Sequence, residues 1–212
     1  METSQEVRIE AVLFDYGGVL ADSPFEAFAR YEREQGLPEG FIRSLNMANP
    51  DDNAWARLER SELDFGEFCD EFEREASAAG GSVDARSLFA SFSSSLRPDM
   101  VEVAKRCAQT FKTGLLTNNF VSPIRDSGHA HVLDLFDVVI ESSAIGVRKP
   151  DPRFYLLACE ELGIEPPQAV FLDDLGVNLK PARQLGMVTI RVGPDIGEAI
   201  RALEDTVGLR LR

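Results

Sequence analysis

Five short runs of apolar residues constrain the fold of this chain more than any other feature. They lie at residues 9–14, 113–117, 137–141, 169–173 and 187–192. Each run has the length and composition of a buried strand, and the connections between the last four have helical character. Strands and helices that alternate in this way predict an α/β fold in which helices cover both faces of a parallel sheet.

The connection between the first two runs is much longer than one crossover helix needs. Three helical patterns occupy it: "PFEAFARYEREQG", "DFGEFCDEFEREA" and "VDARSLFASF". The first should end at Gly36, and Asp64 and Glu67 have capping-box spacing at the start of the second. Pro98 is well placed to begin the helix that returns to the sheet.

These patterns predict a helical insertion that could cover the sheet as a cap. We place the cap at residues 21–97 and the α/β core at residues 1–20 and 98–212. The phenylalanines of the insertion are expected to form its own hydrophobic core.

Polar side chains stand where three of the predicted strands end. Asp15 follows the first run, Thr117 ends the second, and the pair Asp173-Asp174 ends the fourth. A further motif, "GVRKPDP", supplies Lys149 soon after the strand at 137–141. Ligands of open parallel sheets bind beyond the carboxyl ends of the strands, so these side chains should meet in one crevice.

Three carboxylates gathered in one crevice require a cation. Asp15, Asp173 and Asp174 supply the hard oxygen ligands that Mg²⁺ prefers, and Lys149 with the Thr117 hydroxyl can hold phosphate oxygens. This set predicts phosphoryl transfer, with Asp15 attacking phosphorus in line to form an aspartyl-phosphate. Each motif by itself is also compatible with a helix cap or an ordinary surface position.

The motifs "FDYGGVL", "LLTNN", "RKPDP" and "VFLDDLGVNLKPARQLGM" together resemble the haloacid dehalogenase (HAD) superfamily. The resemblance covers residues 9–205. The last of these motifs is especially similar to the phosphatase domain of soluble epoxide hydrolase and to the phosphatase-like domain of acyl-CoA dehydrogenase family members ten and eleven. It implies a HAD-like Rossmannoid core of three layers with a helical cap of type C1, and a Mg²⁺-dependent phosphatase acting on small organic phosphates.

The same resemblance implies roles for individual residues. Asp15 matches the nucleophile and a metal ligand, and Thr117 and Lys149 match the pair that holds phosphate. Asp174 matches the direct metal ligand of the last motif. Asp173 matches its partner, acting through water or by orienting Lys149. Asn118 follows Thr117 as it does in these relatives and is expected to contact substrate.

One position departs from the family pattern. The first motif usually has a second Asp, which protonates the leaving group and later deprotonates the attacking water, and here this position is Gly17. Glycine keeps the backbone carbonyl that the family offers to the metal, so the departure weakens acid/base catalysis and leaves metal binding intact. Asp22 is the nearest substitute acid, although a hinge or helix-capping role suits it better.

Two other functions stay open from these residues. Gly17 is also compatible with a catalytically degenerate module that binds or regulates. A 2-haloacid dehalogenase would use the same nucleophile but needs no metal, and the pair Asp173-Asp174 argues against it.

The amino-acid composition indicates which classes of binding partner and which cellular compartment to expect. With 36 acidic and 22 basic side chains the net charge is −14, which disfavours nucleic acid and anionic membranes as partners. Three separated cysteines and a polar amino terminus predict a cytoplasmic protein without disulfides. The expected partner is a small-molecule phosphate, and the sequence leaves the oligomeric state open.

Overall fold

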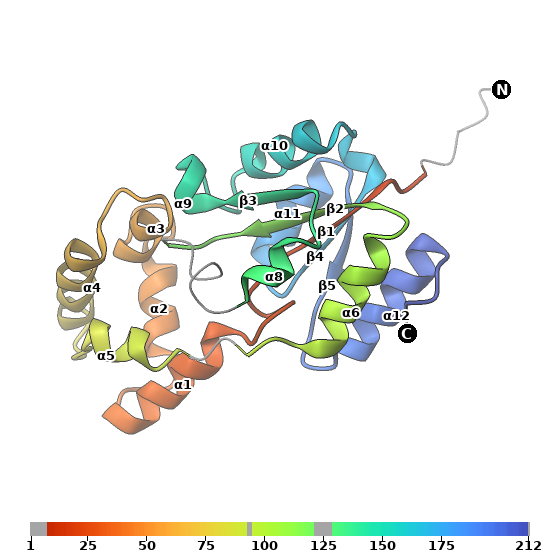
Figure 1. Cartoon of the computed structure of the whole chain (residues 1–212). Helices are drawn as coiled ribbons and strands as arrows, with labels where there is room; N and C mark the ends of the chain where they lie inside the picture. Colours follow the sequence, from red (N-terminus) through yellow and green to blue (C-terminus); the bar gives the residue numbers. More distant parts are fainter. Residues whose placement is uncertain (1–7, 93–94, 121–128, 212) are drawn as a thin grey trace.

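A computed structural model describes residues 8–92, 95–120 and 129–211 and shows one parallel five-stranded sheet (Figure 1). The strand order is β3-β2-β1-β4-β5. The strand bounds are β1 Ala11–Phe14, β2 Lys112–Thr117, β3 Val138–Glu141, β4 Ala169–Asp173 and β5 Val188–Arg191. All five predicted strands are present, and the predicted α/β class is confirmed.

Helices cover both faces of this sheet, so the core has three layers. On one face α6 and α12 pack against apolar side chains such as Val12, Leu115 and Val170; on the other, α10 and α11 pack against Leu13, Leu116 and Phe171. The helices of these layers are α6 Pro98–Cys107, α8 Ala130–Leu133, α9 Ser142–Ile145, α10 Pro152–Leu162, the 3₁₀ turn Pro166–Gln168, α11 Gly176–Gln184 and α12 Ile196–Val207.

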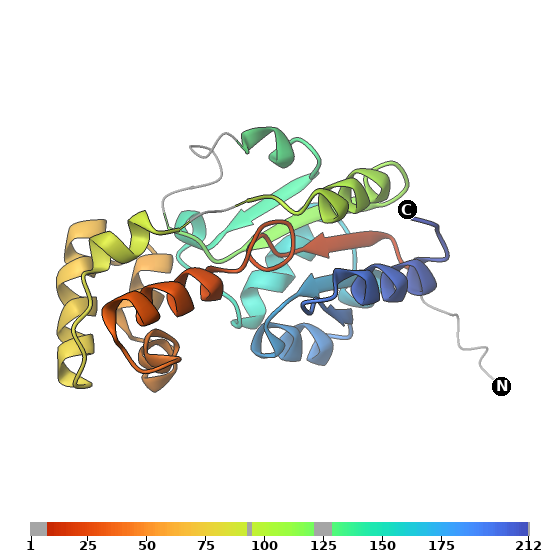
Figure 2. The ribbon, with the colours of Figure 1, turned by 90° about the horizontal axis from the view of Figure 1, so that it is seen from below.

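Five further helices lie together beyond one end of the sheet, and β1 points towards them (Figure 2). They are α1 Pro24–Gln35, α2 Phe41–Ala48, α3 Ala54–Glu59, α4 Phe65–Ala78 and α5 Ala85–Ala90. Three of them match the predicted helices, whereas α2 and α3 were not predicted. The division into a cap at 21–97 and a core at 1–20 and 98–212 stays a prediction.

The helix starts and ends that were predicted from single residues are present in the structure. Helix α1 ends at Gly36, which adopts the left-handed conformation with φ 68°, where a Cβ would be strained. Asp64 and Glu67 form the complete capping box of α4, and Pro98 is the first residue of α6.

The five helices share their own apolar core, separate from the two clusters that flank the sheet. Phe28, Phe68 and Phe72 are buried in it, and Trp55 contacts all three rings, with centroids 5.4–6.0 Å away. The prediction that the phenylalanines of this segment form a core of their own is therefore confirmed. Within the described residues, no helix is long and apolar enough to span a membrane.

Candidate active site

The order of the strands brings the polar strand ends together. β1 lies between β2 and β4, and the backbone N–H of Asp15 donates to the carbonyl of Leu172 on β4 over 2.9 Å. Asp15, Asp173 and Asp174 each have a carboxylate oxygen within 4.8 Å of an oxygen of the other two. The crevice predicted from the sequence is therefore present at the carboxyl ends of neighbouring strands.

Lys149 pairs with two of these carboxylates. Its Nζ is 2.8 Å from Oδ1 of Asp15 and 2.8 Å from Oδ2 of Asp173, and it also donates to the carbonyl of Leu116 over 2.8 Å. The side chain is 1% exposed. Burial opposes its charge, but Asp15 and Asp173 outweigh burial and raise the pKa of Lys149, so the amine stays protonated.

Asp173 is completely buried, and both of its oxygens are occupied by protein donors. Besides Lys149, Oδ2 accepts from Nδ2 of Asn178 at 3.0 Å, and Oδ1 accepts from the backbone N–H of Leu175 at 2.8 Å. These bonds favour the second of the two roles predicted for Asp173, in which it orients Lys149.

Asn118 holds the backbone of Lys149 from both sides. Its Oδ1 accepts the Lys149 N–H at 2.8 Å, and its Nδ2 donates to the Lys149 carbonyl at 3.0 Å. These contacts give Asn118 a positioning role; it also lines the cavity beside the strand ends, and its contact with substrate stays a prediction. The hydroxyl of Thr117 makes only a long 3.5 Å contact with the Asn118 carbonyl, which leaves it available to a ligand.

Asp15 and Asp174 retain oxygens that no other described residue engages. Oδ1 of Asp15 accepts from Lys149 and from the Tyr16 N–H at 2.7 Å, whereas Oδ2 has no donor among the described residues. Burial, reinforced by Asp173, raises the pKa of Asp174 to about 6. Burial also raises the pKa of Asp15 well above its usual value, and Lys149 only partly offsets it.

Burial is the main cause of the raised pKa values of Asp15 and Asp174, and the neighbouring carboxylate of Asp173 adds to it, because one lysine does not balance three carboxylates. The free oxygens of these two acids fit a hard divalent cation such as Mg²⁺.

Two adjacent glycines shape the turn after β1. Gly18 has φ 76°, and a Cβ there would collide with the carboxylate of Asp174, so glycine is needed for Asp174 to approach. Gly17 differs, because a Cβ there would meet only Cδ of Pro24, at an ordinary 3.6 Å. The missing acid at position 17 is therefore not explained by lack of space.

A cavity of about 540 Å³ opens between the strand ends and the five helices. Asp15, Gly17, Thr117, Lys149 and Asp174 line it on the sheet side. On the helical side it is lined by residues of α1, α2 and α3, among them Phe25, Phe28, Arg43, Asn46, Met47, Trp55 and Glu59. It is larger than a phosphate group requires, so a leaving group fits beside the phosphate.

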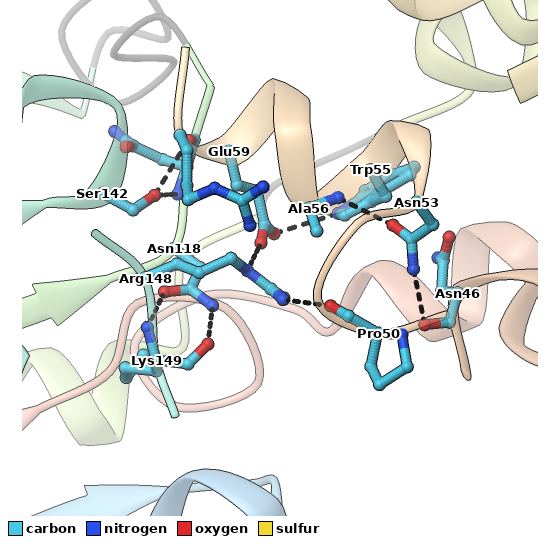
Figure 3. A network of polar contacts seen from close by, with 12 residues as sticks. Asn46, Pro50, Asn53, Trp55, Ala56, Glu59, Asn118, Ser142, Arg148 and Lys149 are labelled. Atoms are coloured by element: carbon cyan, nitrogen blue, oxygen red, sulfur yellow. Dashed lines mark hydrogen bonds and ion pairs between the residues drawn. The ribbon is translucent and has the colours of Figure 1, made fainter. Parts of the chain in front are cut away.

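A polar network ties α3 to the loop that carries Lys149 (Figure 3). Arg148 Nε donates to Oε2 of Glu59 at 2.6 Å, and its Nη1 donates to the carbonyl of Pro50 at 2.9 Å. The other oxygen of Glu59 accepts from Nε1 of Trp55 at 2.9 Å. The helical side of the cavity is thus bonded to the residue that precedes Lys149.

Asp22 does not reach the cavity wall. Its carboxylate lies 4.0 Å from Nε of Arg97 and is 39% exposed. Asp22 is therefore not placed to act as the substitute acid, and the N-cap residue of α1 is its neighbour Ser23. His129 and His131 lie at the start of α8 and belong to no metal-ligating cluster of the described residues.

Several residues of the site were not predicted from the sequence. One of them is Asn178, which bonds Asp173 five positions before it. The others are Arg148 and Glu59, which bond each other across 89 positions of the chain. Asn178 lies one turn after the pair Asp173-Asp174, at the start of a helix, and that spacing is the only sequence signal that could have indicated it.

Comparison with known proteins agrees with these features. The family model of haloacid dehalogenase-like hydrolases matches residues 9–186. The chain is 36% identical to mouse acyl-CoA dehydrogenase family member 10 and 34% identical to pig bifunctional epoxide hydrolase 2, across 95% and 97% of its own length. It spans only 19% and 40% of those two proteins. It is also 31% identical to phosphatase MT3486 of Mycobacterium tuberculosis, across 85% of this chain and 86% of that protein.

Solved structures show the same fold. A HAD-family enzyme from Bacteroides thetaiotaomicron, in complex with magnesium and inorganic phosphate, superposes with a TM-score of 0.62 at 20% identity, covering 90% of this chain and 98% of that one. An L-2-haloacid dehalogenase from Xanthobacter autotrophicus superposes with a TM-score of 0.64 at 25% identity, covering 95% and 84%. Together with the match of the family model, these likenesses show that the chain belongs to the haloacid dehalogenase-like hydrolases.

Proposed function

We propose that this hydrolase is a Mg²⁺-dependent phosphatase that acts on small organic phosphates through an aspartyl-phosphate on Asp15. The observation that carries the proposal is the arrangement of Asp15 between a buried, charged Lys149 and the carboxylate of Asp174, at the floor of a cavity. The likeness to the mycobacterial phosphatase across most of both chains supports it.

Asp15, Asp174 and the carbonyl of Gly17 would hold the metal ion. The two carboxylates have unengaged oxygens, whereas those of Asp173 are occupied, so we assign Asp173 to orient Lys149. When bound, Mg²⁺ would neutralise the excess negative charge and allow an anionic phosphate to approach Asp15.

The protein's own residues would then carry the reaction. The Thr117 hydroxyl would bind a phosphate oxygen. Lys149, whose Nζ already donates to Asp15, Asp173 and the Leu116 carbonyl, would fix the Asp15 carboxylate and place its positive charge beside the phosphate. An Asp15 oxygen forms a bond to phosphorus while the bond from phosphorus to the leaving oxygen breaks, and that oxygen keeps the electron pair. Water then attacks phosphorus, which releases inorganic phosphate and regenerates Asp15.

Gly17 restricts the leaving groups that suit this site. Among the described residues, the acids that line the cavity besides Asp15 and Asp174 are Asp51 and Glu59, and Glu59 is paired with Arg148. General acid/base catalysis is typically worth about 10² to 10⁴ in rate, so its loss slows the reaction without abolishing it. Acyl and aryl phosphates, which depart without a proton, should therefore be better substrates than alkyl phosphates.

A panel of acyl, aryl and alkyl phosphates, assayed with Mg²⁺ and with a chelator, tests this function. We expect phosphate release that requires Mg²⁺ and is lost in Asp15→Asn. If no phosphate is released while phosphate analogues still bind with Mg²⁺, the second candidate holds, a degenerate binding module, which the glycine at position 17 favours.

The remaining alternative, a 2-haloacid dehalogenase, shares the fold of one solved neighbour. The cluster of three acids around Lys149 argues against it, because carbon–halogen displacement by Asp15 needs no metal. Release of chloride from 2-chloropropionate without Mg²⁺ would favour this alternative over the phosphatase.

A further inference from the structure

One face of α2 lies along the cavity, away from the strand ends. Arg43, Asn46 and Met47 have the spacing i, i+3, i+4, and all three line the same cavity as Asp15. We propose that this face is a subsite for a second anionic group, carried at the far end of the leaving group. The proposal deepens the proposed phosphatase function by naming the class of its substrate.

Arg43 is the charged residue of this face. Arg43 forms no ion pair with any described residue, and its guanidinium carbon lies 5.1 Å from the centre of the Phe25 ring. The amide oxygen of Asn46 is buried and accepts no hydrogen bond within the described part of the chain. This oxygen is closed to solvent and can only accept a hydrogen bond, so it offers nothing to an anion, and the guanidinium of Arg43 is the group of this face that can bind one.

The other cations of the cavity are already engaged. Lys149 is held between Asp15 and Asp173, and Arg148 is paired with Glu59. Arg191 lies at the sheet end, where its Nε is 3.4 Å from the carbonyl of Asp174. On the helical wall, Arg43 is therefore the lining cation that remains for a ligand.

The wall beside Arg43 is apolar. Phe25, Phe28 and Trp55 line it, and the side chain of Met47 is 67% exposed when no ligand covers it. Aromatic and thioether surfaces favour a flat, apolar ligand body. The inferred substrate is thus a phosphate monoester with an apolar, preferably aromatic, body and a carboxylate or similar anion at its other end.

Binding of arylmethylphosphonates tests this subsite independently of turnover, because their carbon–phosphorus bond is not cleaved by phosphoryl transfer. Three spacers between the phosphonate and a carboxylate would be compared: phenyl, phenylethyl and biphenyl. Each carboxylate has its methyl ester as the uncharged partner. Trp55 is the single tryptophan of the chain and lines the cavity, so its emission reports binding in the presence of Mg²⁺.

We expect the carboxylate to bind more tightly than its ester for at least one spacer, and Arg43→Gln to reduce that preference about fivefold. Arg33→Gln removes the same charge from an exposed position of α1 outside the cavity and should leave the preference unchanged. The ratio of carboxylate to ester cancels any general effect of a variant on folding or phosphonate binding.

The subsite is refuted if Arg43→Gln and the wild type show the same ratio for all three spacers, or if the wild type binds none of the phosphonates at millimolar concentration. Failure of the proposed function is a different result. In that case the carboxylates bind through Arg43, but the corresponding aryl phosphates release no phosphate with Mg²⁺.

Discussion

The ion pair between Glu59 and Arg148 should couple the helical side of the cavity to the catalytic loop. Its atoms are 2.6 Å apart, and the two side chains are 10% and 21% exposed. Breaking a fully buried pair costs about 3–5 kcal/mol, whereas exposed pairs contribute about 0.2–1 kcal/mol. This pair lies between those limits, so we expect a coupling energy of about 1–2 kcal/mol.

The two single variants should not be equivalent. Arg148→Gln leaves the Glu59 carboxylate buried, with only the indole N–H of Trp55 as a donor. In Glu59→Gln, Arg148 stays bonded to the carbonyl of Pro50, and its side chain is the more exposed of the two in the wild type. We therefore expect Arg148→Gln to lower the free energy of unfolding by about 2 kcal/mol and Glu59→Gln by about 1 kcal/mol.

A double-mutant cycle measures this coupling. The free energy of unfolding in urea, followed by the emission of Trp55, would be compared for the wild type, Arg148→Gln, Glu59→Gln and the double variant, together with kcat/KM on an aryl phosphate. The control is Arg153→Gln, because Arg153 pairs with Asp151 at 2.7 Å but is 74% exposed, and this variant should leave stability unchanged. A coupling energy indistinguishable from zero would refute the network as the connection between α3 and the Lys149 loop.

Three further predictions concern the site itself. Gly17→Asp should raise the rate on alkyl phosphates at least about tenfold and change the rate on aryl phosphates little, because position 17 has room for a side chain that can act as the general acid. An unchanged rate on alkyl phosphates in a steady-state assay would argue against the idea that this acid is missing. Gly18→Ala should weaken Mg²⁺ binding in a calorimetric titration, since its Cβ displaces the Asp174 carboxylate, and unaltered affinity would contradict the geometry. Because the pKa of Asp174 is raised to about 6, that of Asp15 is also raised, and only the ionised forms bind metal, the Kd for Mg²⁺ should rise at least about tenfold per pH unit below pH 6. An affinity that is constant from pH 5 to 7 would show that Asp174 is not a ligand.

Much of the core could be predicted because its signals are local in the sequence. Each buried strand is an apolar run, and a polar residue at its end marks where the chain leaves the sheet. The capping box at Asp64 and Glu67 and the proline at position 98 each complete their bonds or angles within one turn. Such features need no knowledge of distant partners, and they were predicted correctly.

Neither of the two helices that were not predicted, α2 and α3, has a strong signal of its own in the sequence. α3 has six residues, and the N–H of its first residue, Ala54, donates to Oε1 of Glu75 on α4 over 2.8 Å. So short a helix has little intrinsic stability, and tertiary packing supplies the rest. α2 begins after Gly40, which has no side chain to cap it, so the usual start signal is absent.

The finer roles within the site could not be predicted for the same reason. Nothing in the sequence distinguishes Arg148 from a surface arginine, because Glu59 lies beside it only in the fold. Likewise, the sequence does not show that both ends of the Asn118 amide bond the backbone of Lys149. Motif order indicated which residues meet, whereas three-dimensional contacts separate those that face the ligand from those that position them.

The central claim is that Asp15 attacks phosphorus, and trapping the intermediate tests it most directly. The protein would be mixed with an aryl phosphate and Mg²⁺, quenched in acid within milliseconds, and analysed by peptide mass spectrometry. The account predicts a phosphate group on the peptide that carries Asp15, absent without Mg²⁺ and absent in Asp15→Asn. Phosphate release at an undiminished rate from a protein that never carries phosphate at Asp15 would contradict it.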